Sequence, residues 1–192
     1  MRSIPEKKFR SQTEGILHLL FDWVAALVMA LAVLITLFIF LFRVVVVDGD
    51  SMQTTLYDKD RLVLWTVGYH PEQGDIVVVD RYATDPLIKR VVAVEGDVVE
   101  ITHDCKFFLN GEAQHESYIQ GVTVPRDVSE PVTVPAGYVF VMGDNRTISK
   151  DSRMTEIGLV NIKDIVGKAV YRHWPLQSFG GVYNNLEDNL GQ

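Results

Sequence analysis

The chain has 192 residues, of which 47% are hydrophobic, enough for one sizeable folded domain and a membrane segment. Its formal net charge is −7, and residues 44–192 alone carry 13 basic and 22 acidic side chains, a net charge of −9. Because phosphate contacts need clustered cations, this balance argues against a nucleic-acid partner.

The first predicted element is a transmembrane helix over residues 23–42. These 20 residues carry no charged side chain, and at about 1.5 Å rise per residue they can cross a hydrocarbon core of about 30 Å. A cleavable signal peptide would have a shorter apolar core of about 7 to 15 residues, followed by a small-x-small site. A buried helix of a soluble domain would not be apolar on every face. Arg43 and a run of valines follow instead, so a retained anchor is predicted.

Basic residues are concentrated before this span, which predicts a cytoplasmic amino terminus. Only Arg43 follows the span immediately, whereas Arg2, Lys7, Lys8 and Arg10 precede it. The expected organisation is a cytoplasmic segment at 1–22, the single transmembrane helix at 23–42, an extracytoplasmic domain at 43–178 and a loosely ordered tail at 179–192.

Beyond the span, short runs of β-branched and aromatic residues alternate with turn residues, as is typical of an antiparallel β domain with few helices. The expected strands are residues 61–66, 75–80, 88–94, 97–102, 106–109, 138–142 and 165–171. The stretch 103–135 is less regular and contains three prolines, so a small subdomain or an excursion from the main sheet is expected there. The predicted fold class is mainly β with one amino-terminal helix.

Several familiar catalytic motifs are missing: Gly-x-Ser-x-Gly, His-Glu-x-x-His, paired Cys-x-x-Cys and a phosphate-binding glycine-rich loop. Three other segments stand out together with the anchor. They are Asp-Gly-Asp-Ser-Met at 48–52, Lys-Arg-Val-Val at 89–92 and Gly-Asp-Asn-Arg-Thr-Ile-Ser-Lys-Asp-Ser-Arg at 143–153. In this order behind an amino-terminal span, they resemble the signal peptidase I family, and the resemblance extends from the anchor to about Pro175.

A serine and a lysine can be paired on chemical grounds alone. A serine hydroxyl is a poor nucleophile near neutral pH, so a base has to take its proton, and a neutral lysine amine can do so. Lysine titrates near 10.4, and a base working near neutrality needs a pKa of roughly 7 to 8, which burial among apolar groups can provide. Ser51 lies nine residues beyond Phe42, near the membrane face where a lipid-embedded substrate would expose its cleavage site.

Strand alternation predicts that Lys89 is buried and that Arg90 is solvated. Lys89 shares a face with Val91 and Ala93, while Arg90 points to the other side. The alternative for Lys89 is an edge-strand lysine that blocks aggregation. Ser51 could equally be a turn or cap serine, because Asp-Gly-Asp-Ser is turn-forming sequence. The presence of all three segments favours the catalytic interpretation.

The resemblance implies a signal peptidase/LexA-like peptidase fold and a dyad in which Ser51 is the nucleophile and Lys89 the general base. Met52 is expected to line the substrate cleft, with core packing as a compatible alternative. The family pattern also implies that the hydroxyl of Ser149 helps to orient the lysine.

Further supporting residues are implied in the third segment. Asp151 and Arg153 match a supporting ion pair, for which a planar guanidinium is well suited. Asp144 and Asn145 are expected to support the site and its turn, although solvated loop residues would look the same without the family pattern.

By the same resemblance, the reaction is removal of signal peptides from exported preproteins after an Ala-x-Ala-like site, through an acyl-enzyme and without metal or cofactor. The expected partners are preproteins and the lipid bilayer, and the expected location is the cytoplasmic membrane.

Some positions depart from the family pattern. Gly49 lacks a hydroxyl that some members offer to the oxyanion, Thr54 replaces a proline, and Ala93 and Glu95 replace a glycine and a proline. These changes leave the details of the cleft open.

Two other functions stay open. A sortase-like transpeptidase would use the single cysteine, Cys105, with a histidine partner, and thiol reagents would inhibit it; against this, Cys105 lacks the usual Thr-Leu-x-Thr-Cys setting. A binding or assembly protein on the same scaffold would hold precursors without cutting them. The presence of Ser51, Lys89 and Ser149 argues against that alternative.

Overall fold

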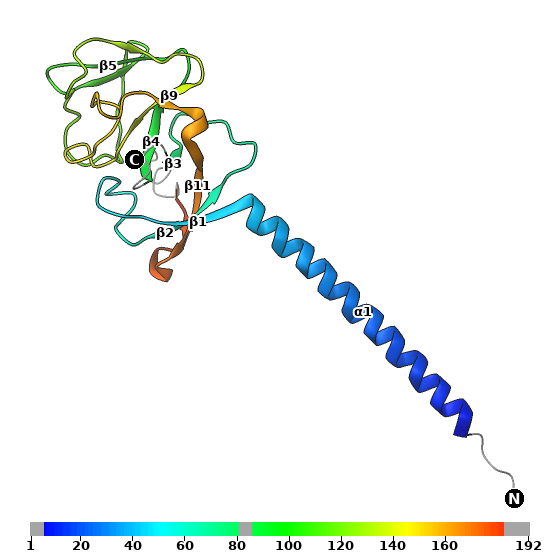
Figure 1. Cartoon of the computed structure of the whole chain (residues 1–192). Helices are drawn as coiled ribbons and strands as arrows, with labels where there is room; N and C mark the ends of the chain where they lie inside the picture. The colour runs from blue at the N-terminus through cyan, green and yellow to red at the C-terminus, as the bar shows by residue number, and fades with distance from the viewer. Residues whose placement is uncertain (1–5, 81–85, 183–192) are drawn as a thin grey trace, which may run out of the picture. The chain divides into compact units, whose positions relative to one another are not determined.

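The computed structural model describes residues 6–80 and 86–182, and it confirms a mainly β fold with one amino-terminal helix (Figure 1). The chain divides after Leu41 into a helical unit and a β-rich unit. All pairings between the named strands are antiparallel. The site segments singled out above all belong to the β-rich unit.

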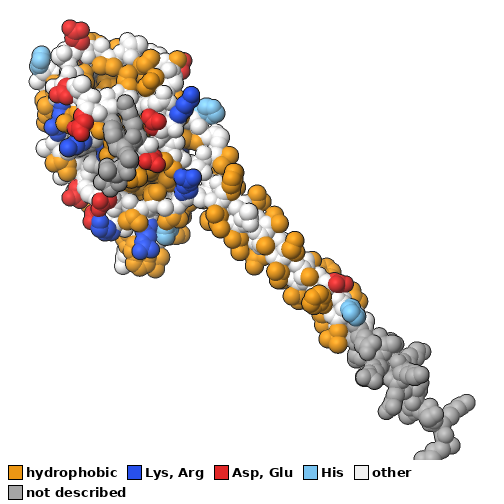
Figure 2. Space-filling view, in the orientation of Figure 1, with side chains coloured by type: hydrophobic (Ala, Val, Ile, Leu, Met, Phe, Trp, Pro, Cys, Tyr) orange, Lys and Arg blue, Asp and Glu red, His pale blue; other side chains and the backbone are white. Residues whose placement is uncertain are grey.

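Helix α1 runs from Glu6 to Leu41. Its part Leu17–Leu41 is long and apolar enough to cross a membrane, and its hydrophobic side chains are exposed, as Figure 2 shows for one side. Such a surface is suited to lipid rather than to water. The helix begins well before residue 23 and ends one residue before the expected limit, because Phe42 is already paired in a strand.

An eight-stranded sheet forms the body of the β-rich unit, in the order β1-β2-β11-β3-β4-β9-β10, with β12 paired to β11. Its strands are β1 (Phe42–Val46), β2 (Arg61–Trp65), β3 (Ile76–Val79), β4 (Leu87–Ala93), β9 (Tyr138–Met142), β10 (Val160–Asn161), β11 (Ile165–Trp174) and β12 (Gly180–Gly181). The short 3-10 helices η1 (Ile162–Asp164) and η2 (Leu176–Ser178) precede and follow β11. Five of the expected strands form here.

A smaller four-stranded sheet, ordered β7-β6-β5-β8, lies at the end of the unit away from β1 and β2 (Figure 1). Its strands are β5 (Val98–Ile101), β6 (Phe107–Leu109), β7 (Glu112–Ala113) and β8 (Val132–Thr133). The substructure expected at 103–135 therefore begins earlier, because Val99 pairs with both Leu109 and Val132. Val99 also packs in one core cluster with Phe140 of the main sheet, so the two sheets share a core.

The first residues of the predicted tail, 179–181, are ordered rather than loose. Gly180 and Gly181 pair with β11, and the ring of Phe179 packs edge-on against Tyr171 with their centroids 5.1 Å apart. Backbone pairing and a ring contact thus order these residues. The rest of the predicted tail, residues 183–192, lies outside the described part of the chain.

Strand β11 contains a glycine, Gly167, next to the point where Lys168 pairs with Trp65 of β2. A Cβ atom at Gly167 would lie 2.4 Å from the carbonyl oxygen of Trp65, too close for any real contact. We expect Gly167→Ala to lower the free energy of unfolding by about 1–3 kcal/mol, because paired strands would have to shift. Urea unfolding of the detergent-solubilised chain measures this, with Gly15→Ala as the control because its added methyl group meets open space. Equal midpoints for the two variants would contradict the expectation.

Candidate active site

The three sequence segments converge where β4 and β9 run side by side. Arg90 of β4 is registered opposite Met142 of β9, so the lysine strand lies against the start of the third segment. The turn after β1 joins them, because the backbone N–H of Asn145 donates to the carbonyl oxygen of Ser51 at 3.0 Å. Segments that are far apart in sequence are thereby fixed at one place.

Gly143 permits this convergence because a side chain would not fit there. A Cβ atom at this position would lie 2.2 Å from Oγ of Ser149 and 2.5 Å from the carbonyl oxygen of Ser51. The backbone N–H of Gly143 donates to Asp151 at 3.1 Å. The glycine is required by the close approach of neighbouring segments rather than by an unusual backbone conformation.

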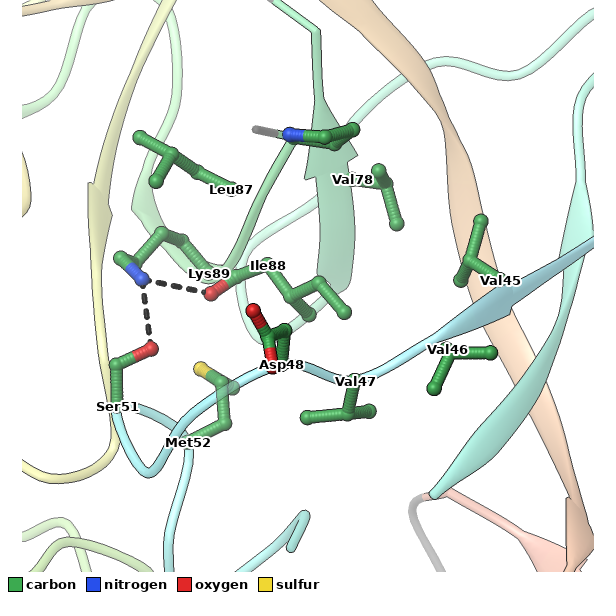
Figure 3. Close-up of a pocket in the computed structure, with 11 residues that line it drawn as sticks. Val45, Val46, Val47, Asp48, Ser51, Met52, Val78, Leu87, Ile88 and Lys89 are labelled. Carbon is green, nitrogen blue, oxygen red and sulfur yellow. Dashed lines mark hydrogen bonds between the residues drawn. The ribbon is translucent and has the colours of Figure 1, made fainter. Parts of the chain in front are cut away.

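Ser51 and Lys89 meet at the centre of the site. Nζ of Lys89 lies 2.8 Å from Oγ of Ser51 and also donates to the carbonyl oxygen of Ile88 at 2.9 Å (Figure 3). The lysine is only 3% exposed. As an ammonium it donates to both oxygens; once it loses a proton, the same separation lets the Ser51 hydroxyl donate to the amine.

Burial lowers the pKa of Lys89 from 10.5 to about 8, because desolvation disfavours the ammonium form. The charges of Asp151 and Asp144 act in the opposite direction but do not outweigh burial. A difference of this size corresponds to about 3 kcal/mol against the charged form. A useful fraction of the amine is therefore neutral at neutral pH.

Two buried ion pairs contain the carboxylates whose charges act on the amine. Arg90 grips Asp144 through Nε at 2.8 Å and Nη2 at 2.6 Å, and Arg153 grips Asp151 through Nε and Nη2, both at 2.8 Å. All four side chains are fully buried. Burial acts to raise the pKa of Asp151, but the hydrogen bonds and charge of Arg153 hold that pKa below its ordinary value. The fork of each guanidinium leaves neither carboxylate unpaired.

The prediction that Arg90 is solvated is wrong, because the side chain is 0% exposed. Alternation does send it to the other face of β4, but that face is covered. The ring of Tyr118 lies 4.1 Å from the guanidinium carbon, and the carbonyl oxygen of Gly74 accepts from Nη1 at 2.8 Å. Strand alternation shows which way a residue points, but it cannot show that a distant loop folds over it.

Ser149 lies inside this network without taking the expected contact. Its Oγ is fully buried and has no hydrogen-bond partner of standard geometry among the residues that the structure describes. It approaches Asp151 closely enough to help lower the pKa of that carboxyl. Instead, the carbonyl oxygen of Ile88 accepts a hydrogen bond from the Lys89 amine and so orients it. Because this acceptor is a backbone atom, no residue type in the sequence indicates it.

An apolar cavity of about 350 Å³ opens beside the Ser51–Lys89 pair (Figure 3). Met52 is 1% exposed, contributes to the cavity wall and belongs to the core cluster, so the expected core packing is present and a role in a substrate cleft stays a prediction. A mainly apolar hollow of this size is large enough to receive part of a ligand. The lining residues are Val45, Val46, Val47, Asp48, Ser51, Met52, Val78, Pro86, Leu87, Ile88 and Lys89.

The positions that depart from the family pattern take ordinary structural roles. Gly49 has a φ of 83°, which glycine adopts without strain. The hydroxyl of Thr54 donates to the carbonyl oxygen of Tyr118 at 3.2 Å. Ala93 is fully buried in the core shared by the two sheets, and Glu95 accepts a backbone hydrogen bond at 3.2 Å. These substitutions leave the Ser51–Lys89 contact intact.

Cys105 lies in the turn between β5 and β6, and it is not among the described residues that line the cavity. Its Sγ lies 3.9 Å from the carbonyl oxygen of His103, and Asp104 pairs with Lys106 at 2.8 Å. In residues 6–80 and 86–182, no group of three or more His, Cys, Asp and Glu side chains is arranged to hold a metal ion.

A family model and known relatives agree on one family. The family model described as "Signal peptidase, peptidase S26" matches residues 20–174. Signal peptidase IB of Staphylococcus aureus (strain Mu50 / ATCC 700699) is 32% identical over 184 residues, covering 86% of this chain and 95% of the relative. Signal peptidase I of Bacillus licheniformis is 36% identical over 169 residues, covering 81% and 89%. A solved signal peptidase I from Enterococcus faecalis V583 has 27% identity and a TM-score of 0.43, covering 53% of this chain and 98% of that chain.

We expect Lys89→Met to stabilise the protein below about pH 8. The folded pKa of about 8 lies below the unfolded value of 10.5, so the unfolded chain binds the proton more tightly and the stability of the parent rises as pH increases between these values. Below this window the buried ammonium costs about 3 kcal/mol, which methionine avoids.

Urea unfolding at several pH values measures this difference. The variant should be more stable than the parent at about pH 7, and its advantage should vanish near pH 10.5. The exposed Lys163 supplies the control Lys163→Met. An advantage that stays the same at every pH would show that the folded pKa is not lowered.

Proposed function

The chain belongs to the signal peptidase family, peptidase S26, and is a serine endopeptidase; from this premise we propose that it cleaves signal peptides from exported preproteins with Ser51 as nucleophile and Lys89 as general base. The observation that carries the proposal is the 2.8 Å approach of the lysine amine to the serine hydroxyl beside an apolar cavity. A pKa of about 8 for Lys89 supports its role, because it supplies neutral amine near neutral pH.

In the first half of the proposed reaction, Oγ of Ser51 attacks the carbonyl carbon of the scissile peptide bond. The neutral amine of Lys89 takes the hydroxyl proton as the new C–O bond forms. The resulting ammonium gives this proton to the leaving nitrogen as the C–N bond breaks. The products of this half are an acyl-enzyme and the free amino terminus of the mature protein.

In the second half, a water molecule attacks the acyl-enzyme while Lys89 accepts its proton. The ester bond then breaks, and the proton returns to Oγ of Ser51 as the signal peptide leaves with a carboxyl terminus. The backbone N–H of Ser51 is the proposed donor to the oxyanion. Gly49 has no hydroxyl to offer, so a second donor has to come from another group.

The remaining site residues take supporting roles in this proposal. Asp144 and Asp151, each gripped by an arginine, hold the third segment, and Asn145 fixes the backbone of Ser51 through its N–H. For Ser149 we propose that its buried hydroxyl, which lies close to Asp151, supports Lys89 while the amine protonates the leaving group. Met52 forms part of the wall that receives the substrate.

The form of the cavity supports cleavage after an Ala-x-Ala-like site. Alternate side chains of an extended peptide point to the same side, so two side chains flanking an outward-facing one turn toward the enzyme together. Valine and isoleucine side chains line the cavity beside Ser51. Small residues at those two positions bring the scissile carbonyl close to the hydroxyl.

We propose that α1 anchors the protein in the cytoplasmic membrane with its amino terminus inside and the β-rich unit outside. The excess of basic residues before the span supports this orientation. Ser51 follows the end of the helix at Leu41 by ten residues, which reach at most about 35 Å. This length sets an upper limit on the distance between the nucleophile and the end of the span.

We expect Ser51→Ala and Lys89→Ala each to reduce cleavage of a purified precursor with an Ala-x-Ala site by about 10³-fold or more, because each removes one partner of the proton transfer. The assay uses the detergent-solubilised full chain, and urea unfolding checks that the variants are folded. Cys105→Ser is the matched control and should cut like the parent. An inactive parent that still binds precursor would favour the binding-protein alternative, and loss of activity in Cys105→Ser would favour a thiol enzyme.

The pH dependence of cleavage tests the base directly. We expect kcat/KM of the parent to rise about tenfold per pH unit at low pH and to level off near pH 8, because only the neutral amine of Lys89 accepts the proton. Rates measured from about pH 5 to about pH 10 define this limb. A profile that is flat across this range would rule out a base with a pKa of about 8.

A further inference from the structure

The loop segment 116–120 belongs to none of the three sequence motifs, yet it is bonded to the third of them. The backbone N–H of Gln120 donates to the carbonyl oxygen of Asp144 at 2.8 Å, and the N–H of Arg146 donates to the carbonyl oxygen of Gln120 at 2.9 Å. The loop thus runs beside the segment that carries the buried carboxylates.

Glu116 ties this loop to the third segment through a buried ion pair. Its carboxylate binds Nη1 of Arg146 at 2.5 Å and Nη2 at 2.6 Å. The arginine side chain is 0% exposed and that of Glu116 is 8% exposed. Arg146 also donates from Nε to the carbonyl oxygen of Gly143 at 3.1 Å and from Nη1 to Thr123 at 2.6 Å. A bidentate pair with these further bonds holds one geometry.

Tyr118 connects the same loop to the lysine strand and to the turn that carries Ser51 and Thr54. Its ring covers the guanidinium of Arg90 at 4.1 Å, and its hydroxyl donates to Glu116 at 2.6 Å. Its carbonyl oxygen accepts from the hydroxyl of Thr54 at 3.2 Å. Burial, with the neighbouring charge of Glu116, raises the pKa of Tyr118, so the phenol stays protonated and keeps donating.

We propose that Glu116 and Tyr118 are positioning residues for the proposed reaction: together they brace two buried arginines and so hold the lysine strand against the nucleophile and third segments. The inference rests on the Ser51–Lys89 dyad of the proposed function. Neither residue is among those that line the cavity, so both act through other groups. Small displacements matter in such a site, since a misplacement of about 1 Å can cost about 10²-fold in rate.

The brace also affects how easily Lys89 gives up its proton. Asp144 and Asp151 both favour the ammonium, and each is held by its own arginine. Without the ring of Tyr118, water reaches Arg90 and competes for its contact with Asp144. Greater hydration and a less compensated carboxylate both favour the charged amine, so the titration moves to higher pH.

Tyr118→Leu in the detergent-solubilised full chain tests the proposal. We expect kcat for precursor cleavage at about pH 7 to fall about tenfold or more with KM nearly unchanged, and the acid limb of the pH profile to move upward, so that activity partly returns at higher pH. Tyr118→Phe keeps the ring on Arg90 and should retain most of the activity. Glu116→Gln keeps the shape but loses the charge, and should lower kcat several-fold with KM unchanged.

Tyr138→Leu is the matched control for lost packing. Its ring packs against the core cluster shared by the two sheets, so this variant should lose stability without a shift of the pH profile. If the parent cuts and folded Tyr118→Leu keeps the kcat and the profile of the parent, the positioning role is wrong. If Tyr118→Leu does not fold, parent-like kcat in Glu116→Gln overturns the proposal. A parent that does not cut overturns the proposed function instead.

Discussion

Exclusion of water from the amine of Lys89 is the constraint on which the rest of the site depends. A lysine in water is an ammonium at neutral pH and cannot take a proton, and burial is what lowers its pKa to about 8. Burial requires protein to cover most of the lysine side chain, and three distant segments contribute this cover. Their close contact in turn requires Gly143, where even a methyl group would strike Ser149 and the backbone of Ser51.

The same dry environment determines how charge is distributed around the amine. Two buried carboxylates near a base would restore its ammonium form if they were left alone, and their own desolvation would be costly. Arg90 and Arg153 meet both demands, because a planar guanidinium grips a carboxylate with two bonds and stays charged under all ordinary conditions. The ion pairs therefore serve the low pKa of Lys89 as well as the geometry of the third segment.

The local sequence pattern predicts those structural features that depend on neighbouring residues alone. Most of the main-sheet strands follow from β-branched runs between turn residues, and alternation along β4 correctly sends Lys89 and Arg90 to opposite faces, although both faces are buried. Features that arise from long-range pairing escape this reasoning. The small sheet begins at β5 because distant β8 pairs with it, and Arg90 is buried because a loop some thirty residues away covers it. The hydrogen bond from Lys89 to the carbonyl oxygen of Ile88 is also unpredictable, because a backbone acceptor does not depend on residue type.

The Met52 side chain belongs both to the wall of the cavity beside Ser51 and to the hydrophobic core. Truncating such a residue to widen the cavity removes core packing at a cost of about 2–5 kcal/mol, a large part of the roughly 5–15 kcal/mol by which a domain is stable. Evolution toward bulkier substrates is therefore constrained at this wall by the need to stay folded. Val46 and Asp48 lie on the exposed part of the cavity lining, so substitutions there should change the cavity at little cost in stability.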